Sequence, residues 1–295
     1  MSEIPTTASP LQRVLNFRDV GKTVNTLSDE VVLKPGLFYR SGLPDDATPL
    51  DRLKLQTEYN LKTIIDLRTD SEHVEQVRKN AAKIPSSPVA EPKDPAKALR
   101  IPGVEYKYIN FNGHAYSSAL IKQLSYWNAA KLFTLYVLGY RTQAISILGE
   151  NVMARRGLEG LAEDSLQHCT AEVKAVFDIL SDERNYPVLV HCTQGKDRTG
   201  LVVLLLLRLC GVKPSLIDQD YMMSAKELEP EREKRLVEIR GIGLPDDFAG
   251  CAEGWVEGVV GWIEREHGGI EEYLKRCCGV TDEQIQAVKG ILLQK

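Results

Sequence analysis

The feature that most constrains the fold is the segment 188–209, in which an apolar strand, a polar loop and an apolar helix follow one another. Residues 188–190 read Val-Leu-Val, the kind of run that forms a strand buried on both faces of a parallel sheet. Residues 201–209 are apolar on nearly every side of a helix, so that helix has to pack against a sheet. A second run, Thr-Ile-Ile-Asp-Leu at 63–67, predicts another buried strand. We therefore predict an α/β domain with a mostly parallel sheet.

The remaining elements fit the same class. Further strands are predicted at residues 31–33, 37–39 and 104–111. Further helices are predicted at 117–149 (two or three amphipathic ones), at 171–180, and from Thr48, Ser215 and Thr281 onward. The proline-rich segment 85–102 is predicted to be a surface loop, because it can be neither a helix nor a central strand. The last third of the chain is predicted to be all helix.

Composition excludes several classes of function. The formal net charge of −4 argues against a general nucleic-acid binder. No apolar run approaches the roughly 20 residues that a membrane helix needs, so we expect no integral membrane contact. The first ten residues have neither the basic nor the apolar part of a signal peptide. We therefore expect a cytoplasmic protein whose six cysteines are free thiols.

The loop between the strand and the apolar helix begins with Cys192 and ends with Arg198, with five residues between them. The loop amides and the N-terminus of the helix predict an anion site, and the same positive field favours a thiolate at Cys192. The planar fork of Arg198 can hold two oxygens of a phosphoryl group. Gly195 allows a close backbone approach, and Thr199 can donate a hydrogen bond to the sulfur. A buried structural thiol would leave the arginine and the glycines unexplained.

The string His-Cys-Thr-Gln-Gly-Lys-Asp-Arg-Thr-Gly at 191–200 resembles the Cys-x5-Arg signature of protein tyrosine phosphatases. In its fuller form it resembles the atypical tyrosine/serine phosphatase family of fungi and bacteria. Asn-Phe-Arg-Asp-Val-Gly at 16–21 is similar to that family's N-terminal motif. Shorter blocks at 39–41, at 66–68 with Glu72 beyond, and at 220–221 match in the same order.

The resemblance implies a single phosphatase domain over 16–295, after a mobile tail at 1–15. It implies a central four- or five-stranded, mostly parallel sheet flanked by helices, with an all-helical C-terminal region. Residues 114–165 would form a helical insertion that is either a lid over the site or a packed helical layer. The implied chemistry needs no metal and no cofactor: Cys192 attacks phosphorus, and water then hydrolyses the phosphocysteine.

The expected site residues fall into three groups. Catalytic roles are expected for Cys192, Asp197, Arg198 and Thr199. Substrate binding is expected from Thr193, Gln194, Gly195, Lys196 and Arg198. Supporting roles are expected for His191, Arg18, Asp19, Arg40, Asp66 and Arg68.

One part of the family pattern is missing. The family implies that an Asp on a separate loop, after the strand at 104–111, acts as the general acid. Residues 110–114 read Asn-Phe-Asn-Gly-His and contain no carboxylate. Asp197, within the loop itself, is the nearest candidate, although it could instead brace the loop. His114 is the second candidate.

The substrate also stays open. We expect phosphotyrosine, with phosphoserine or phosphothreonine as further protein substrates. A second loop cation, Lys196, also occurs in phosphoinositide and inositol-phosphate phosphatases of the same superfamily, so those ligands are the alternative; Lys196 could equally pair with a carboxylate. An alternative of another class is a binding module that captures phosphorylated ligands without turnover. The sequence does not determine the oligomeric state.

Overall fold

The central sheet has five strands in the order β1-β2-β5-β3-β4, and every pairing except that of β1 with β2 is parallel. The computed structural model describes residues 9–28, 30–81 and 100–294. The strands are β1 (Arg18–Asp19), β2 (Phe38–Ser41), β3 (Thr63–Asp66), β4 (Glu105–Tyr108) and β5 (Val188–His191). The predicted α/β class with a mostly parallel sheet is confirmed, and the two strands predicted from continuous apolar runs are β3 and β5.

Helices form most of the chain after β4. The α-helices are α1 (Val20–Ser28), α2 (Pro49–Thr57), α3 (Asp70–Ala81), α5 (His114–Lys122), α6 (Tyr126–Val137), α7 (Arg141–Leu148), α8 (Ala154–His168), α9 (Thr170–Leu180), α10 (Asp197–Leu209), α11 (Pro214–Glu227), α12 (Arg232–Gly241), α13 (Trp255–His267), α14 (Ile270–Glu272) and α15 (Asp282–Leu292). Shorter helical turns are η1 (Gly149–Met153), η2 (Glu183–Asn185), η3 (Glu229–Glu231), η4 (Asp246–Ala249) and η5 (Tyr273–Cys277). Within the described ranges, no helix combines the length and the apolar character that crossing a membrane requires.

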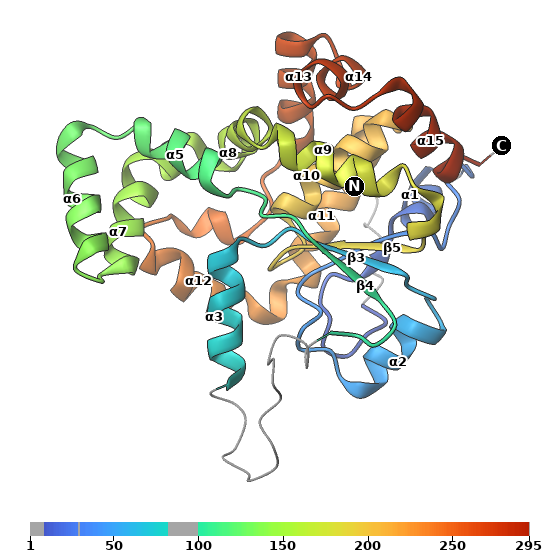
Figure 1. The fold of residues 1–295 in the computed structure, drawn as a ribbon, viewed down its shortest axis with the longest axis horizontal. Coiled ribbons are helices and arrows are strands. Elements are labelled where there is room, and N and C mark those ends of the chain that lie inside the picture. Colours follow the sequence, from blue (N-terminus) through green and yellow to red (C-terminus); the bar gives the residue numbers. More distant parts are fainter. Residues whose placement is uncertain (1–8, 29, 82–99, 295) are drawn as a thin grey trace.

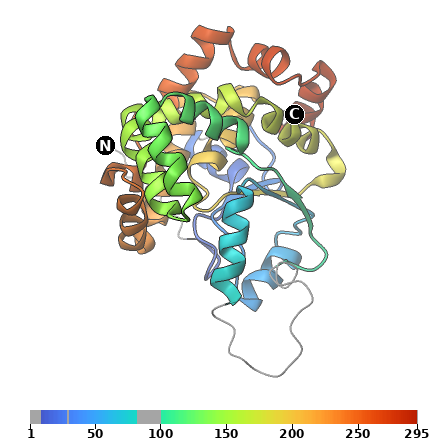
Figure 2. The ribbon, with the colours of Figure 1, turned by 60° about the vertical axis from the view of Figure 1, so that its left-hand side comes forward.

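Alternate residues of the central strands enter two different hydrophobic clusters. Val188 and Val190 of β5 belong to a large cluster with residues of α8, α9, α10 and α13. Leu189, between them, belongs to a smaller cluster with residues of α2 and of the N-terminal segment. Successive strand side chains point to opposite faces, so the sheet is covered on both sides. Figure 1 shows α9 and α10 on one side of the sheet and α2 on the other, and Figure 2 shows the same layers from a second direction.

The helix starts predicted at Thr48 and Thr281 are confirmed by their caps. Each threonine side chain accepts a hydrogen bond from the backbone N–H three residues on, and the side chain at that third position bonds back to the threonine N–H. Such a capping box satisfies two backbone donors that a helix otherwise leaves without partners. The helix expected from Ser215 begins one residue earlier, at Pro214, whose fixed φ suits a first helical position.

The three helices within 117–149 are α5, α6 and α7, and they differ in how they pack. Tyr116 and Leu120 of α5 are buried, as are Ala144 and Ile147 of α7. Helix α6 buries none of its residues. The buried side chains of α5 and α7 therefore attach the helical insertion to the domain, whereas α6 projects from it. In Figure 2 these helices are the green hairpin that comes forward.

Two expected strands differ in the structure. Residues 31–33 do not form a strand with β2, because Leu33 instead forms an isolated bridge with Leu293 near the C-terminus. The strand expected at 104–111 is limited to β4. It ends where tight turns begin: the Phe111 N–H bonds to the Ile109 carbonyl, and Asn112 adopts a positive φ of 65°.

Part of the expected N-terminal tail is packed. Leu11 and Val14 are buried, and the N–H groups of Gln12 and Arg13 donate to the Asp51 carboxylate of α2 at 2.7 and 3.1 Å. Residues 9–15 therefore belong to the packed structure, which corrects the expectation of a tail over 1–15. Residues 1–8, and most of the loop predicted at 85–102, lie outside the described residues.

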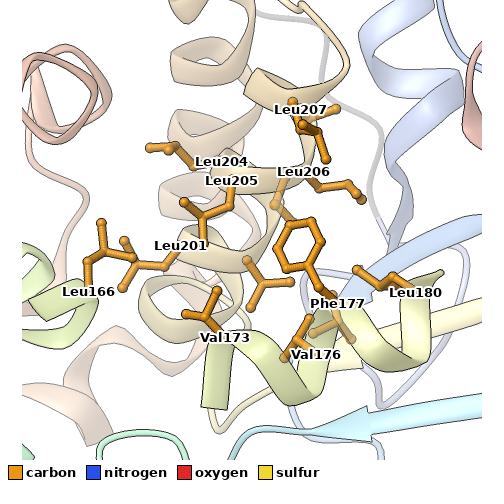
Figure 3. Packing of buried hydrophobic residues seen from close by; sticks show 14 of the residues in the cluster. Leu166, Val173, Val176, Phe177, Leu180, Leu201, Leu204, Leu205, Leu206 and Leu207 are labelled. Atoms are coloured by element: carbon orange, nitrogen blue, oxygen red, sulfur yellow. The ribbon is translucent and has the colours of Figure 1, made fainter. Parts of the chain in front are cut away.

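The contact between α9 and α10 generates a stability prediction. In Figure 3, Phe177 of α9 points toward the leucines of α10, and its side chain is fully buried. We expect Phe177→Ala to lower the free energy of unfolding by about 3–5 kcal/mol, because it removes buried apolar surface and leaves a cavity. The half-exposed Leu53 of α2 is the control, and Leu53→Ala should stay within about 0.5 kcal/mol of the wild type. Urea unfolding measures both, and equal losses would contradict the assigned core.

Candidate active site

The loop after β5 is held through its carbonyl groups. The Leu43 N–H donates to the Thr193 carbonyl at 3.1 Å, and the Asn16 amide donates to the carbonyls of residues 194 and 195 at 3.1 and 3.0 Å. Arg40 Nη2 donates to the carbonyl of Gly195 at 2.7 Å. In the part of the chain that the structure describes, no acceptor bonds to the N–H groups of residues 193–197. Because a trans peptide directs its N–H opposite to its carbonyl, the loop presents a set of free donors to an anion.

Gly195 is required by the geometry of this loop. Its φ is +68°, a conformation that side chains other than glycine rarely adopt. A Cβ atom at this position would lie 2.1 Å from the Ser41 carbonyl oxygen, inside the van der Waals contact distance. Glycine therefore lets the loop pass directly over the end of β2.

A buried charge cluster positions Arg40. The Asp220 carboxylate of α11 accepts from Arg18 Nε at 2.7 Å and, through its other oxygen, from Arg40 Nη1. Arg18 also donates to the Asp220 carbonyl at 2.7 Å and to the Asn16 side chain. Burial, together with the neighbouring Arg18 cation, lowers the pKa of Arg40 to about 10, while the Asp220 carboxylate opposes that shift. Arg40 therefore stays charged at neutral pH and remains bonded to the loop carbonyls.

Arg198 at the start of α10 is held by Glu72 of α3. Its Nη1 donates to Glu72 Oε2 at 2.6 Å and to the Leu67 carbonyl at 3.1 Å, and its Nη2 donates to Glu72 Oε1 at 2.7 Å. A guanidinium has five N–H donors, and those on Nε and the second on Nη2 have no partner among the described residues. These two donors lie along one edge of the guanidinium, the edge that can contact two phosphoryl oxygens together.

The Glu72 carboxylate is ionised in this pair. Burial favours its neutral form, but the hydrogen bonds and the charge of Arg198 outweigh that effect and hold the pKa of Glu72 well below its usual range. Glu72 also accepts from the Thr193 hydroxyl. The same carboxylate thus orients both the arginine and one side chain of the loop.

Cys192 lies at the base of the loop and is buried. Thr199 Oγ1 is also buried and has no hydrogen-bond partner among the described residues. His191 Nδ1 lies 3.1 Å from the Cys192 carbonyl, and His191 Nε2 lies 3.5 Å from the Asp66 carboxylate. Arg68 donates to Asp66 through Nε at 3.0 Å and through Nη2 at 2.6 Å. Burial lowers the pKa of His191.

Two predicted site residues lie elsewhere. The Lys196 side chain is buried, and its ammonium donates to the carbonyls of Phe248, at 3.1 Å, and Gly250. Its ammonium therefore binds the scaffold rather than the open side of the loop, which corrects the expectation of a second loop cation there; its backbone N–H remains among the free donors of the loop. The Asp19 carboxylate accepts from the backbone N–H of Lys22 at 3.0 Å and of Gly36 at 2.6 Å. It caps the start of α1 and does not contact the loop.

Three side chains are candidates for the general acid. Asp197 is half exposed at the first position of α10, with the Lys196 ammonium 3.5 Å from its carboxylate. His114 is exposed at the start of α5. Asp70 was not considered from the sequence; it is exposed at the start of α3 and accepts from the Asn110 amide at 3.1 Å. The fold thus brings a carboxylate to the loop after β4, where the sequence itself has none.

A cleft of about 450 Å³ opens beside the loop. Thr193 and Gln194 line it, and its other walls come from α3, the N-terminal segment and the region of α11 and α12. Three basic side chains line it, Arg13, Lys234 and Arg235, together with an equal number of carboxylates. Arg235 is buried, and its Nε and Nη1 have no partner among the described residues. Arg235 lies in a charged run from which the sequence gives no signal of burial.

The model of the tyrosine phosphatase family matches residues 9–294. The chain belongs to the tyrosine phosphatase family. It is 32% identical over 164 residues to the tyrosine-protein phosphatase of Nostoc commune, covering 50% of this chain and 55% of that protein. It is 28% identical over 122 residues to the triple specificity protein phosphatase PtpB of Mycobacterium tuberculosis, covering 36% of this chain and 44% of that protein.

A plant relative has a different named substrate. The inositol diphosphatase DSP5 of Arabidopsis thaliana is 30% identical over 82 residues, covering 28% of this chain and 40% of that protein. The chain therefore spans about half the length, or less, of these three relatives.

The pair formed by Glu72 and Arg198 generates a prediction about pH. We expect Glu72→Gln to lower the free energy of unfolding at pH 7, because the Arg198 cation loses its carboxylate. The pKa of Glu72 is lowered in the folded state, so its contribution is complete above the ordinary value of about 4.3 and is lost as the pH falls below it. The deficit of the variant should therefore stay constant from pH 7 to about pH 5 and shrink as the pH falls below about 4 in urea unfolding.

Glu253 supplies the control, since it is exposed and forms no ion pair with a described residue. Glu253→Gln should leave the free energy of unfolding unchanged across the same pH range. A deficit for Glu72→Gln that does not depend on pH would mean that Glu72 acts only through packing.

Proposed function

We propose that this chain is a cysteine-dependent phosphatase that hydrolyses phosphate monoesters through a phosphocysteine intermediate. The observation that carries the proposal is the loop itself. Its free backbone donors, the buried Cys192 and the unused edge of Arg198 all belong to one turn between β5 and α10. A tetrahedral phosphoryl group satisfies all three at once, which a carboxylate or a thiol ligand does not.

The reaction has two displacement steps. The Cys192 thiolate attacks phosphorus, the P–O bond to the leaving group breaks, and the acid donates a proton to the departing oxygen. Water then attacks the phosphocysteine, the P–S bond breaks and inorganic phosphate leaves, with Cys192 restored as a thiolate. The group that gave its proton in the first step can accept one from water in the second. No oxidant, metal or cofactor enters this balance.

Stabilisation of charge in each step comes from preorganised donors. As bonds to phosphorus change, charge builds on the three oxygens that do not leave. The loop N–H groups and the two free donors of Arg198 are already fixed by the scaffold, so they need no reorganisation when that charge develops. The Thr199 hydroxyl can stabilise the sulfur as it leaves in the second step.

The favoured substrates are phosphotyrosine proteins, with phosphoserine and phosphothreonine as further substrates. Membership of the tyrosine phosphatase family and the names of two relatives support this preference. A second candidate is an inositol phosphate or phosphoinositide. The name of the plant relative supports it, and so does the buried Arg235 of the cleft beside the loop, whose Nε and Nη1 have no partner among the described residues. The cytoplasmic location expected from the sequence stays a prediction.

Loss of the nucleophile tests the chemistry. We expect Cys192→Ser to lower turnover by several powers of ten while phosphate-ester binding persists, because the loop donors and Arg198 are unchanged. Arg198→Lys should weaken both binding and turnover, since an ammonium cannot make the two-point contact. Chelator should leave the wild-type rate unchanged. Turnover is measured on a panel of phosphopeptides, phosphoinositides and inositol phosphates, and the preferred class decides between the two substrate proposals.

The exposed Cys277 provides a matched control, because Cys277→Ser changes a thiol remote from the loop. It should retain full activity. Retention of more than about a tenth of the activity in Cys192→Ser would overturn the proposed mechanism. A wild-type protein that binds phosphate esters but turns over none of the panel would instead be a binding module.

The identity of the acid is tested by the leaving group. A tyrosine phenolate, with a leaving-group pKa of about 10, needs a proton donor far more than a nitrophenolate does. We propose Asp197 as this donor. Asp197→Asn should slow hydrolysis of a phosphotyrosine peptide by roughly 10²–10⁴ and that of nitrophenyl phosphate much less.

Asp70→Asn is the comparison variant for this experiment. If Asp197 only braces the loop, its replacement should lower both rates equally, because a distorted loop binds every transition state poorly. A loss confined to the peptide substrate in Asp70→Asn would assign the proton to Asp70 instead.

A further inference from the structure

A concentration of exposed apolar side chains lies on α6, α7 and their flanks, residues 121–145, which we call the aromatic hairpin. Nine of the fifteen exposed large hydrophobic residues in the described part of the chain belong to it. Tyr126, Trp127 and Phe133 have exposed fractions of 98%, 82% and 67%. A monomeric soluble domain rarely exposes such a group, so this surface has a partner.

Helical spacing gathers these side chains on one side of α6. Tyr126, Phe133 and Val137 follow one another at intervals of seven and four residues, which places them along a single stripe. The opposite side of α6 contacts α7, and Asn128 of α6 donates to Asn151 at 2.9 Å. The stripe therefore faces away from the domain, as the projecting position of α6 in Figure 1 illustrates.

The charge on the hairpin has one sign. Between Glu105 and Glu150 the chain carries no Asp or Glu, so all 41 acidic residues lie outside this stretch. Lys122, Lys131 and Arg141 are exposed and form no ion pair with a described residue. The remainder of the protein is acidic overall, so the hairpin is a basic and aromatic surface on an acidic molecule.

We propose that the aromatic hairpin docks the enzyme on an anionic lipid surface. Tryptophan and tyrosine favour the headgroup level of a bilayer, because one part of each ring is apolar and the other forms hydrogen bonds. Helices that lie in that interface combine an apolar face with Lys and Arg, and negatively charged lipids attract the cations. Trp127, Phe133 and Lys131 supply this combination on one helix. The docking does not depend on which phosphate ester the site hydrolyses.

A second copy of the chain fits this surface less well. A symmetric contact places the same patch on both subunits, so the three unpaired cations of one hairpin would face those of the other. An anionic surface neutralises them instead.

The hairpin is also fixed to the domain at its base, since Ala144 and Ile147 of α7 are buried.

The hairpin lies at the same edge of the sheet as the catalytic loop. Strands β3, β4 and β5 are parallel, so their carboxyl ends meet at one edge. The loop follows β5 directly, and α5, which leads into the hairpin, follows β4 after a short turn. Docking through the hairpin would therefore turn this edge of the sheet, with the active site, toward the membrane (Figure 1).

Vesicle flotation tests the proposal on the whole chain of 295 residues. The vesicles contain phosphatidylcholine with phosphatidylserine, or phosphatidylcholine alone, and no phosphoinositide, so the active site has no ligand. The wild type should float with the anionic vesicles, and the bound fraction should fall with added salt. Its tryptophan emission should shift to shorter wavelength on binding, because Trp127 is the exposed tryptophan whereas Trp255 is buried and Trp262 half-buried.

Substitutions locate the docking surface. Trp127→Glu should lower vesicle affinity by at least about tenfold, and Lys131→Ala by about fivefold, the worth of one cation at such a surface. The control is Leu53→Glu, which places the same charge at an exposed apolar position of α2, on the far side of the molecule in Figure 1. It should bind vesicles as the wild type does, and so should Cys192→Ser, which separates docking from turnover.

Four outcomes would overturn the proposal. The first is a wild type that binds no anionic vesicle, and the second is an equal loss of affinity in Leu53→Glu. The third is a wild-type dimer in sedimentation that Trp127→Glu dissociates without any vesicle binding, which would make a second copy the occupant. The fourth is a changed turnover of nitrophenyl phosphate in Trp127→Glu without vesicles, with binding unaltered, which would make the hairpin a lid.

Discussion

The candidate active site depends on the buried carboxylate of Asp220. It forms ion pairs with two buried cations, Arg18 and Arg40. Arg40 in turn donates a hydrogen bond to the Gly195 carbonyl and so fixes the loop after β5. Removing one member of such a cluster leaves a buried charge without a partner, which costs far more than the cluster contributes when it is complete. The free-energy cost of leaving a buried charge without a partner therefore keeps the guanidiniums of Arg18 and Arg40 on the Asp220 carboxylate. The orientation of the loop amides follows from the same contact, because a loop whose carbonyls are fixed has no freedom left for its N–H groups.

The sequence predicts the strand, loop and helix around the candidate site well, because this unit is contiguous in the chain. Cys192, Gly195 and Arg198 belong to one turn between a strand and a helix, and local geometry alone brings them together. The expectation that the Lys196 side chain supplies a second cation to the loop was wrong for a reason that no local pattern reveals. Its ammonium is bound by the carbonyls of Phe248 and Gly250, whose place near the loop is set by the packing of the C-terminal helices. The supporting role expected for Asp19 was wrong for a simpler reason. Asp19 lies directly before α1, a position that already suits a helix cap.

Other parts of the site depend on contacts between distant segments. Glu72 could be associated with the site only through a family resemblance, and the structure adds that it occupies the end of the Arg198 guanidinium, leaving the other edge free. Asp70 reaches the loop after β4 because α3 starts beside it. In both cases the segments come together because β3, which precedes α3, lies between β5 and β4 in the sheet. The order of strands in a sheet is the part of a fold that residue patterns determine least.

The attachment of the loop to the N-terminal strands has a consequence for when the candidate site forms. The Asn16 contacts to the loop join residues 178 and 179 positions apart, and the pair formed by Arg18 and Asp220 joins residues 202 positions apart. Contacts of such separation form late in folding, because the chain must close very large loops before they stabilise it. A chain still being synthesised carries its Cys192 without an ordered phosphate site until α11 has left the ribosome. Until then Cys192 lacks the loop geometry on which the proposed chemistry depends, because that geometry forms only when the two halves of the chain meet.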